Sequence, residues 1–168
     1  MALSMYDISV PVFTRGLGQL IHLFDKSLAH AKANGIDTAT LVDARLAPDM
    51  LTLAGQVQRA SDASKLGAAR IAGITAPSFP DEEKTWDDLV ARIRKTQEFL
   101  ATIDRALIDG QEERPVTIKQ REGEAHFTAQ RYLLQFALPN FFFHVTTAYD
   151  VLRHKGMPVG KLDYLGKF

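Results

Sequence analysis

The apolar positions in the first part of the chain follow a helical period. From residue 5 to residue 33 they recur at steps of three and four, which places them on one face of a helix. Pro11 fits only near the start of such a helix, and Asn34-Gly35 supplies a left-handed stop. We therefore expect a long amphipathic helix from near Ser9 to about Ala33. Its apolar stripe consists of Val10, Phe13, Leu17, Leu20, Phe24 and Leu28.

The second helical stripe is rich in small residues. Pro48 is tolerated at the first position of a helix and Gly73 ends the pattern, so the spacing predicts a second helix over residues 48–72. Ala60 and Ser64 would allow another helix to approach closely. The stripe consists of Met50, Leu53, Val57, Ala60, Ser64 and Ile71.

A third helix is predicted after a turn-rich connection at residues 76–80. Thr85 and Asp88 have the spacing of a capping box, which marks a helix start, and Gly110 ends the pattern. The acidic run Asp81–Glu83 just before it is expected to be solvated and to complement the helix dipole. The stripe of this helix consists of Leu89, Ile93, Leu100, Ile103 and Leu107.

The period changes to two between residues 115 and 127. Val116 and Ile118 alternate with polar residues, and Ala125 and Phe127 mirror them beyond Gly123. This pattern predicts a short β-hairpin. Because a two-stranded ribbon is only marginally stable alone, we expect it to lie over the end of the helices.

The last helical pattern runs from about Thr128 to His154. Pro139 lies inside it and has no backbone N–H, so it cannot donate to the carbonyl of Gln135 and should kink or break the helix. The tail at residues 157–168 is too apolar for a free linker, and we expect it to dock on the helices.

Together these patterns predict an all-α fold: one domain over residues 1–168, a four-helix bundle with a short β-hairpin between the third and fourth helices. Four helices of roughly 20 to 28 residues would span ~30–40 Å, which suits such a bundle. The connection at residues 34–47 is long enough for a crossover, so the bundle need not be strictly up-down-up-down.

Composition and charge exclude several classes of function. Twenty Lys and Arg balance twenty Asp and Glu, so the basic excess that favours nucleic acid or anionic membranes is missing. There is no cysteine, which excludes disulfides, thiolate metal sites and cysteine nucleophiles. The first residues lack a signal-peptide pattern and no apolar run reaches ~18 residues, so a cytoplasmic protein without a membrane span is expected.

One histidine stands out from the other four. On a helical wheel of the last helix, Asn140 and His144 share a narrow sector with Phe136, Thr147 and Val151, so we expect both polar side chains to point into the bundle. Buried amide and imidazole groups need partners, and Gln56 on the second helix is one candidate. A polar core cluster and a metal site are both open interpretations. The remaining histidines fit surface or helix-terminal roles: His22, His30, His126 and His154.

The last helix resembles that of a known superfamily. The segment from Asn140 to His144, followed by Leu152-Arg153 and a turn at Gly156, looks like the final helix of the DinB/YfiT-like superfamily. That helix has the pattern His-x-x-x-His, an aliphatic and aromatic stretch, Leu-Arg and a Gly-containing turn. The order of the whole chain, including residues 4–7 and 45–50, is similar to an uncharacterised branch of that superfamily.

The resemblance implies a four-helix bundle, often dimeric. Many members hold a divalent metal with one histidine on the second helix and two on the fourth, and some are thiol-dependent transferases or hydrolases. His144 matches the second of the fourth-helix histidines, Asn140 stands in place of the first, and Gln56 is the nearest polar candidate on the second helix. Three imidazoles suit zinc or nickel, whereas one imidazole with two amides does not.

Two functional hypotheses follow. The first is a non-catalytic, homodimeric module that binds a small-molecule ligand or plays a structural role, with Asn140, His144, Gln56 and Thr147 lining its pocket and no cofactor. The alternative is a divalent-metal-dependent enzyme, a thiol-dependent transferase or hydrolase, in which His144 is a zinc or nickel ligand. The first hypothesis is preferred because the histidine triad is incomplete.

Overall fold

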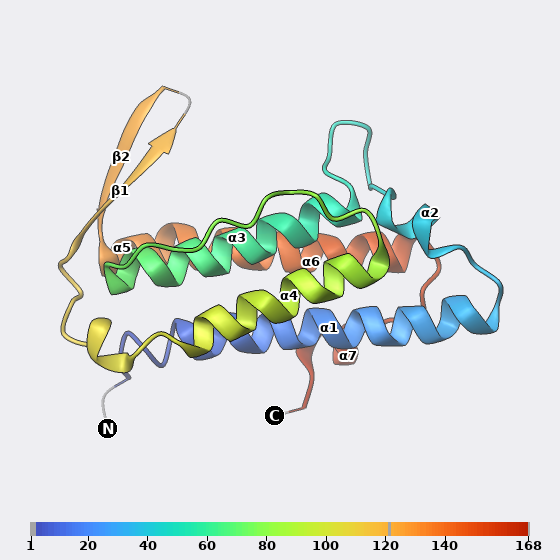
Figure 1. Ribbon diagram of the computed structural model, residues 1–168, viewed down its shortest axis with the longest axis horizontal. Helices are drawn as coiled ribbons and strands as arrows, with labels where there is room; N and C mark the ends of the chain where they lie inside the picture. The colour runs from blue at the N-terminus through green and yellow to red at the C-terminus, as the bar shows by residue number, and fades with distance from the viewer. Residues whose placement is uncertain (1–2, 121, 168) are drawn as a thin grey trace.

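Four long helices lie side by side along the long axis of the molecule (Figure 1). In the computed structural model, which describes residues 3–120 and 122–167, these helices are α1 (Val10–Ala33), α3 (Leu53–Ala72), α4 (Trp86–Ala101) and α6 (Leu138–His154). Their packed faces are apolar: Phe13 and Phe141, for example, meet edge to face with ring centroids 5.2 Å apart. The predicted all-α bundle is confirmed.

The direction of the helices differs from a simple up-down-up-down arrangement. Helices α1 and α6 run one way and α3 and α4 the other, so the chain between α3 and α4 travels the length of the bundle (Figure 1). We call this extended connection, residues 74–85, the strap. The crossover predicted at residues 34–47 is therefore wrong in position, since that connection instead holds the short helix α2 (Thr38–Val42).

Two predicted helix boundaries are corrected by local hydrogen bonds. Helix α3 begins at Leu53 rather than at Pro48, because Thr52 is its N-cap and the Thr52 hydroxyl accepts from the backbone N–H of Gly55. Helix α4 ends at Ala101 rather than near residue 110, and the 3₁₀ turn η1 (Arg105–Leu107) follows it.

The start of α4 is as predicted. The Thr85 hydroxyl accepts from the backbone N–H of Asp88, while the Asp88 carboxylate accepts from the backbone N–H of Thr85 at 2.9 Å. This reciprocal pair satisfies two N–H groups that the first turn of a helix leaves unpaired. The capping box therefore fixes the point where the strap becomes a helix.

The hairpin has the predicted register. Strand β1 (Pro115–Gln120) pairs antiparallel with β2 (Gly123–Thr128), so that Val116 faces Phe127 and Ile118 faces Ala125. Val116 and Ile118 are buried, and the ribbon projects from the end of the bundle beside α5 (Ala129–Tyr132) (Figure 1).

The last helical stretch is interrupted just before Pro139. A π-helical segment, η2 (Leu133–Ala137), separates α5 from α6. Since Pro139 cannot donate the helical hydrogen bond to Gln135, a local distortion was expected, and a widened turn is the form it takes.

The C-terminal tail docks on α1, as predicted for the residues that are described. Helix α7 (Lys161–Leu165) is held by an ion pair of 2.8 Å between Lys26 and Asp163 and by Arg15, which donates to the carbonyl of Leu165. The tail is thus part of the packed structure up to residue 167. Phe168 lies outside the described residues.

Candidate functional site

The site begins with a hydrogen bond between α3 and α6. Gln56 lies in the first turn of α3 and is 2% exposed, and its Oε1 atom is 2.8 Å from Nδ1 of His144 on α6. An amide oxygen can only accept, so Nδ1 of His144 carries the proton. The sequence predicts that Gln56 approaches His144 from the second long helix, and the structure shows this contact.

This bond determines the state of the imidazole. Burial, and to a lesser degree the positive charge of Arg59, lowers the pKa of His144 from 6.5 to about 4. The ring is neutral at pH 7, with its proton on Nδ1 and a lone pair on Nε2. Such a ring can accept a hydrogen bond or bind a metal through Nε2, but it is a weak base.

Asn140 and Thr147 do not join His144 as expected. The Thr147 hydroxyl donates instead to the carbonyl of Phe143 at 2.7 Å. Within residues 3–120 and 122–167 no hydrogen bond connects Asn140 with His144, and both side chains are half-buried rather than inside the core. The expectation that both point into the bundle therefore holds only for His144, which reaches the buried Gln56 on α3, whereas Asn140 lines a groove at the edge of the core.

The predicted sector is buried in the second half of α6 but not at its start. Thr147 and Val151, which share the sector with Asn140 and His144, are buried, whereas Phe136 lies inside η2, where a π turn breaks the step of about 100° per residue, and is exposed. The buried residues of α6 are Phe141, Val145, Thr147, Ala148, Val151 and Leu152. Asn140 and His144 lie at the edge of this buried face, next to α3.

A groove of about 210 Å³ lies between α3 and the α5–η2–α6 stretch. Arg59 on α3 and Asn140 on α6 line it. Gln56 lies one turn before Arg59, and His144 lies one turn after Asn140, so their hydrogen bond is next to the groove. We call this cavity the α3–α6 groove. Its lining residues are Arg59, Asp62, Ala63, Leu66, Arg70, Tyr132, Phe136, Ala137 and Asn140.

Asp62, on the wall of this groove, is neutralised by several cations. Its carboxylate lies 3.0 Å from Arg92, 3.2 Å from Lys65 and 3.5 Å from Arg59. The side chains of Arg92 and Lys65 are 1% and 4% exposed, so these charges are held out of water and need this partner. The main role of Asp62 is therefore structural, because its carboxylate balances the charges of these cations.

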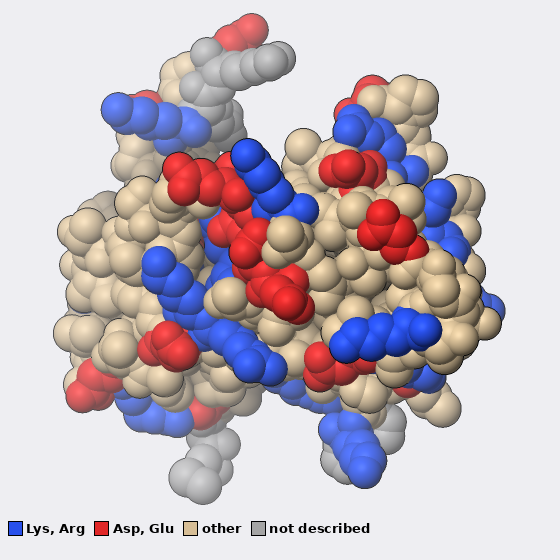
Figure 2. All heavy atoms as spheres, turned by 45° about the vertical axis from the view of Figure 1, so that its right-hand side comes forward, with Lys and Arg blue, Asp and Glu red and all other residues tan. Residues whose placement is uncertain are grey.

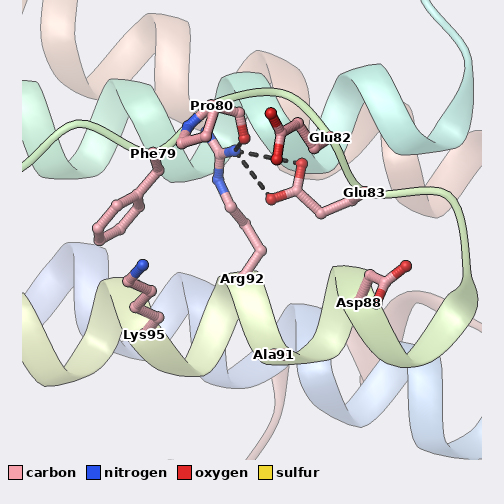
Figure 3. A pocket seen from close by; sticks show the side chains of 8 residues that line it. All are labelled: Phe79, Pro80, Glu82, Glu83, Asp88, Ala91, Arg92 and Lys95. Carbon is pink, nitrogen blue, oxygen red and sulfur yellow. Dashed lines mark hydrogen bonds and ion pairs between the residues drawn. The ribbon is translucent and has the colours of Figure 1, made fainter.

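Arg92 also binds the strap. Figure 3 shows its guanidinium reaching from α4 between Phe79 and Glu83, with bonds of 3.0 Å to Glu83 and to the carbonyl of Pro80. Asp81 lies 3.3 Å away. The ammonium of Lys95 lies 4.4 Å from the centre of the Phe79 ring.

The strap contacts correct the expectation that Asp81–Glu83 is only a solvated run. The Glu83 side chain is 14% exposed. Burial tends to raise its pKa, but hydrogen bonds from Gln58 and Arg92 outweigh burial and the pKa is lowered. Sequence reasoning missed Arg92, although it is three residues after Leu89 on the buried face of α4, and that position was the available signal.

The donor set does not fit the metal that the superfamily resemblance implies. His144 supplies one imidazole next to the groove. The Oε1 atom of Gln56 already accepts the Nδ1 proton of His144. Among the residues that the structure describes, no group of three or more His, Cys, Asp or Glu side chains could hold a metal ion. Zinc and nickel sites in proteins use more nitrogen, sulfur or carboxylate donors than this.

The other histidines occupy the expected surface positions. His22 contacts Asp163 at 3.3 Å with its side chain 54% exposed, and His126 contacts Thr117 on the exposed side of the hairpin. His154 is exposed in the last turn of α6. None of these three residues lines the α3–α6 groove, and the exposed His126 is therefore a useful control.

Comparison with known proteins places the chain in a family. Residues 5–165 match the family described as "Domain of unknown function (DUF1993)". The chain belongs to the DUF1993 family. It is also similar to a solved structure, a DinB family member protein from Shewanella denitrificans, with 37% identity, a TM-score of 0.90, and coverage of 97% of this chain and 92% of that one. No curated protein matches the sequence.

The assignment confirms the DinB-like resemblance of this DUF1993 protein. The similarity spans the four long helices and the hairpin, so the fold expected from the last helix is the fold observed.

No described helix has the length and the apolar character needed to cross a membrane. Figure 2 shows both signs of charge interspersed on the face that includes the strap.

Proposed function

We propose that this DUF1993 protein is a non-catalytic, homodimeric module that binds a small molecule in the α3–α6 groove, with His144 as a recognition residue. One observation carries the proposal: Nδ1 of His144 donates to the buried amide of Gln56, which fixes the ring as a neutral hydrogen-bond acceptor beside a lined cavity. A preorganised acceptor next to an apolar wall is typical of ligand sites.

The same geometry favours binding over proton-transfer catalysis. General bases work best when their pKa lies near the working pH, whereas that of His144 is about 4. Since the lone pair on Nε2 is weakly basic, its use at neutral pH is to accept a hydrogen bond from an N–H or O–H of the ligand. Asn140, one turn earlier on α6, lines the groove itself and supplies a polar group to it.

Exposed apolar side chains support the homodimer in this proposal. Phe142 and Phe143 on α6 and Leu162 and Leu165 on α7 are large, apolar and exposed. Several exposed, large apolar side chains are typical of a surface that another chain covers.

The metal content of untagged protein separates this proposal from the alternative, a divalent-metal-dependent transferase or hydrolase. We expect purified wild-type protein to contain no stoichiometric zinc or nickel. A stoichiometric metal that is lost in His144→Ala and retained in His126→Ala would overturn the proposal, because His126 is exposed on the hairpin and distant from Gln56.

A further inference from the structure

Arg70 is a cation of the α3–α6 groove that lacks a carboxylate partner. It is half-buried on α3, and its Nη1 atom donates to the Tyr132 hydroxyl at 2.8 Å. Its guanidinium carbon lies 5.7 Å from the centre of the Tyr132 ring. Within residues 3–120 and 122–167, no Asp or Glu forms an ion pair with Arg70.

The neighbouring acidic groups are already engaged by other cations. Asp62 is bound by Arg59, Lys65 and Arg92, Asp81 by Arg59 and Arg92, and Glu83 by Arg92. This connected set holds three carboxylates, and three cations other than Arg70 bind them. Of the two arginines that line the groove, Arg59 therefore has carboxylate partners and Arg70 has none among the described residues.

Tyr132 does not supply the missing anion. The residue is 1% exposed, and burial raises the pKa of its phenol despite the opposing effect of Arg70. The phenol is neutral at pH 7, so it orients the guanidinium through one hydrogen bond without neutralising it. The remaining N–H groups of Arg70 form a fork suited to a carboxylate.

One wall of the groove beside Arg70 is apolar. The rings of Tyr132 and Phe136 are stacked, with centroids 5.8 Å apart and planes inclined by 23°. Ala63, Leu66 and Ala137 complete the apolar lining. A cavity of about 150 Å³ is enough to hold benzene in another protein, so about 210 Å³ accommodates one substituted ring.

We infer that the α3–α6 groove binds a small aromatic carboxylate, whose carboxylate pairs with Arg70 and whose ring lies against Phe136 and Leu66. This inference rests on the proposed ligand-binding function and names its ligand class. Asn140 and Arg59, at the other end of the groove, would meet a polar substituent on the ring. The class is therefore a benzoate with a hydroxyl or similar group.

The test is titration calorimetry with benzoate and 4-hydroxybenzoate as probes. We expect both to bind wild-type protein, and benzamide and acetate to bind at least tenfold more weakly, since one lacks the charge and the other the ring. Arg70→Met should weaken benzoate binding at least tenfold. Arg131→Met, an exposed arginine on α5, should leave binding unchanged.

A second variant keeps the test meaningful if Arg70→Met unfolds. Arg70→Lys retains the charge but loses the fork, so it should bind benzoate with intermediate affinity while circular dichroism confirms the fold. The inference fails if wild-type protein does not bind benzoate, if benzamide binds equally well, or if both Arg70 variants bind like the wild type. A metal held by His144 would overturn the proposed function and leave the Arg70 result standing, so the two failures are distinguishable.

Discussion

A single hydrogen bond defines what His144 can do. Its Nδ1 proton is donated to Gln56, which is almost fully buried, and the imidazole is neutral with Nε2 as its acceptor. Removing either partner would leave a buried polar group unpaired, at a cost of about 1–3 kcal/mol. The contact therefore contributes to the stability of the α3–α6 interface as well as to the proposed site.

Acid should destabilise the protein through His144. The folded pKa of about 4 lies below the ordinary value of 6.5, so the unfolded chain binds more protons between these values. The contribution of the neutral ring is fully present above pH 6.5 and is lost as the pH falls toward 4. After discounting for partial exposure, the change is roughly 1–2 kcal/mol.

Denaturant unfolding at pH 7 and pH 4.5 checks this expectation. His144→Leu should lose less stability than the wild type over that interval, because leucine does not titrate. His126→Leu should behave like the wild type, since His126 is exposed. An unchanged pH dependence in His144→Leu would contradict the account.

For individual residues, the sequence predicted some contacts and missed others. The pairing of Gln56 with His144 could be predicted, because a buried amide and a nearby imidazole require partners. The half-buried position of Asn140 could not be predicted, because a helical wheel gives a direction around α6 but not how far a neighbouring helix covers each turn.

The strap is the element that distinguishes this bundle from a simpler one. It crosses from the end of α3 to the start of α4, and Arg92 fixes it to both helices through Asp62, Asp81 and Glu83. The hairpin, the capping box and the helical stripes follow local patterns and were predicted. The crossover was misplaced because it depends on ion pairs between segments far apart in the sequence.

Replacing Arg92 should destabilise the fold strongly. Arg92→Leu removes the cation that pairs with Glu83, whose side chain is 14% exposed, and one of the three cations that pair with Asp62. Breaking comparable buried pairs costs about 3–5 kcal/mol. Equilibrium urea unfolding measures this cost.

Arg105→Leu is the matched control for Arg92→Leu. Arg105 pairs with Asp7 and Asp109, but its side chain is 50% exposed, so a much smaller loss of stability than in Arg92→Leu is expected. Equal losses in the two variants would show that burial of the Arg92 network does not matter.

The whole molecule is a DUF1993 protein with a DinB-like fold. Its outer surface has two candidate binding regions. One is the α3–α6 groove, and the other is the apolar surface on α6 and α7. The fold could be predicted because long periodic helices specify it well. The groove could not be predicted, because it is built from residues of α3 and of the α5–η2–α6 stretch, which are distant in sequence.

A dimer is expected in solution. Light scattering should give twice the 18.7 kDa of one chain, and Phe143→Ser combined with Leu162→Ser should shift the distribution toward monomer. Leu134→Ser, which changes an exposed leucine outside this surface, serves as the control. A monomer of 18.7 kDa at all concentrations would contradict the homodimer.

The central claim is that His144 is a fixed, neutral hydrogen-bond acceptor in a ligand site and not a metal ligand. Side-chain ¹H–¹⁵N spectra of His144 at pH 7, recorded with and without one equivalent of zinc chloride, test it directly. We expect a protonated Nδ1, an unprotonated Nε2 and no response to zinc. A proton on Nε2, or a large zinc-dependent shift of Nε2 that is absent in His126, would contradict it.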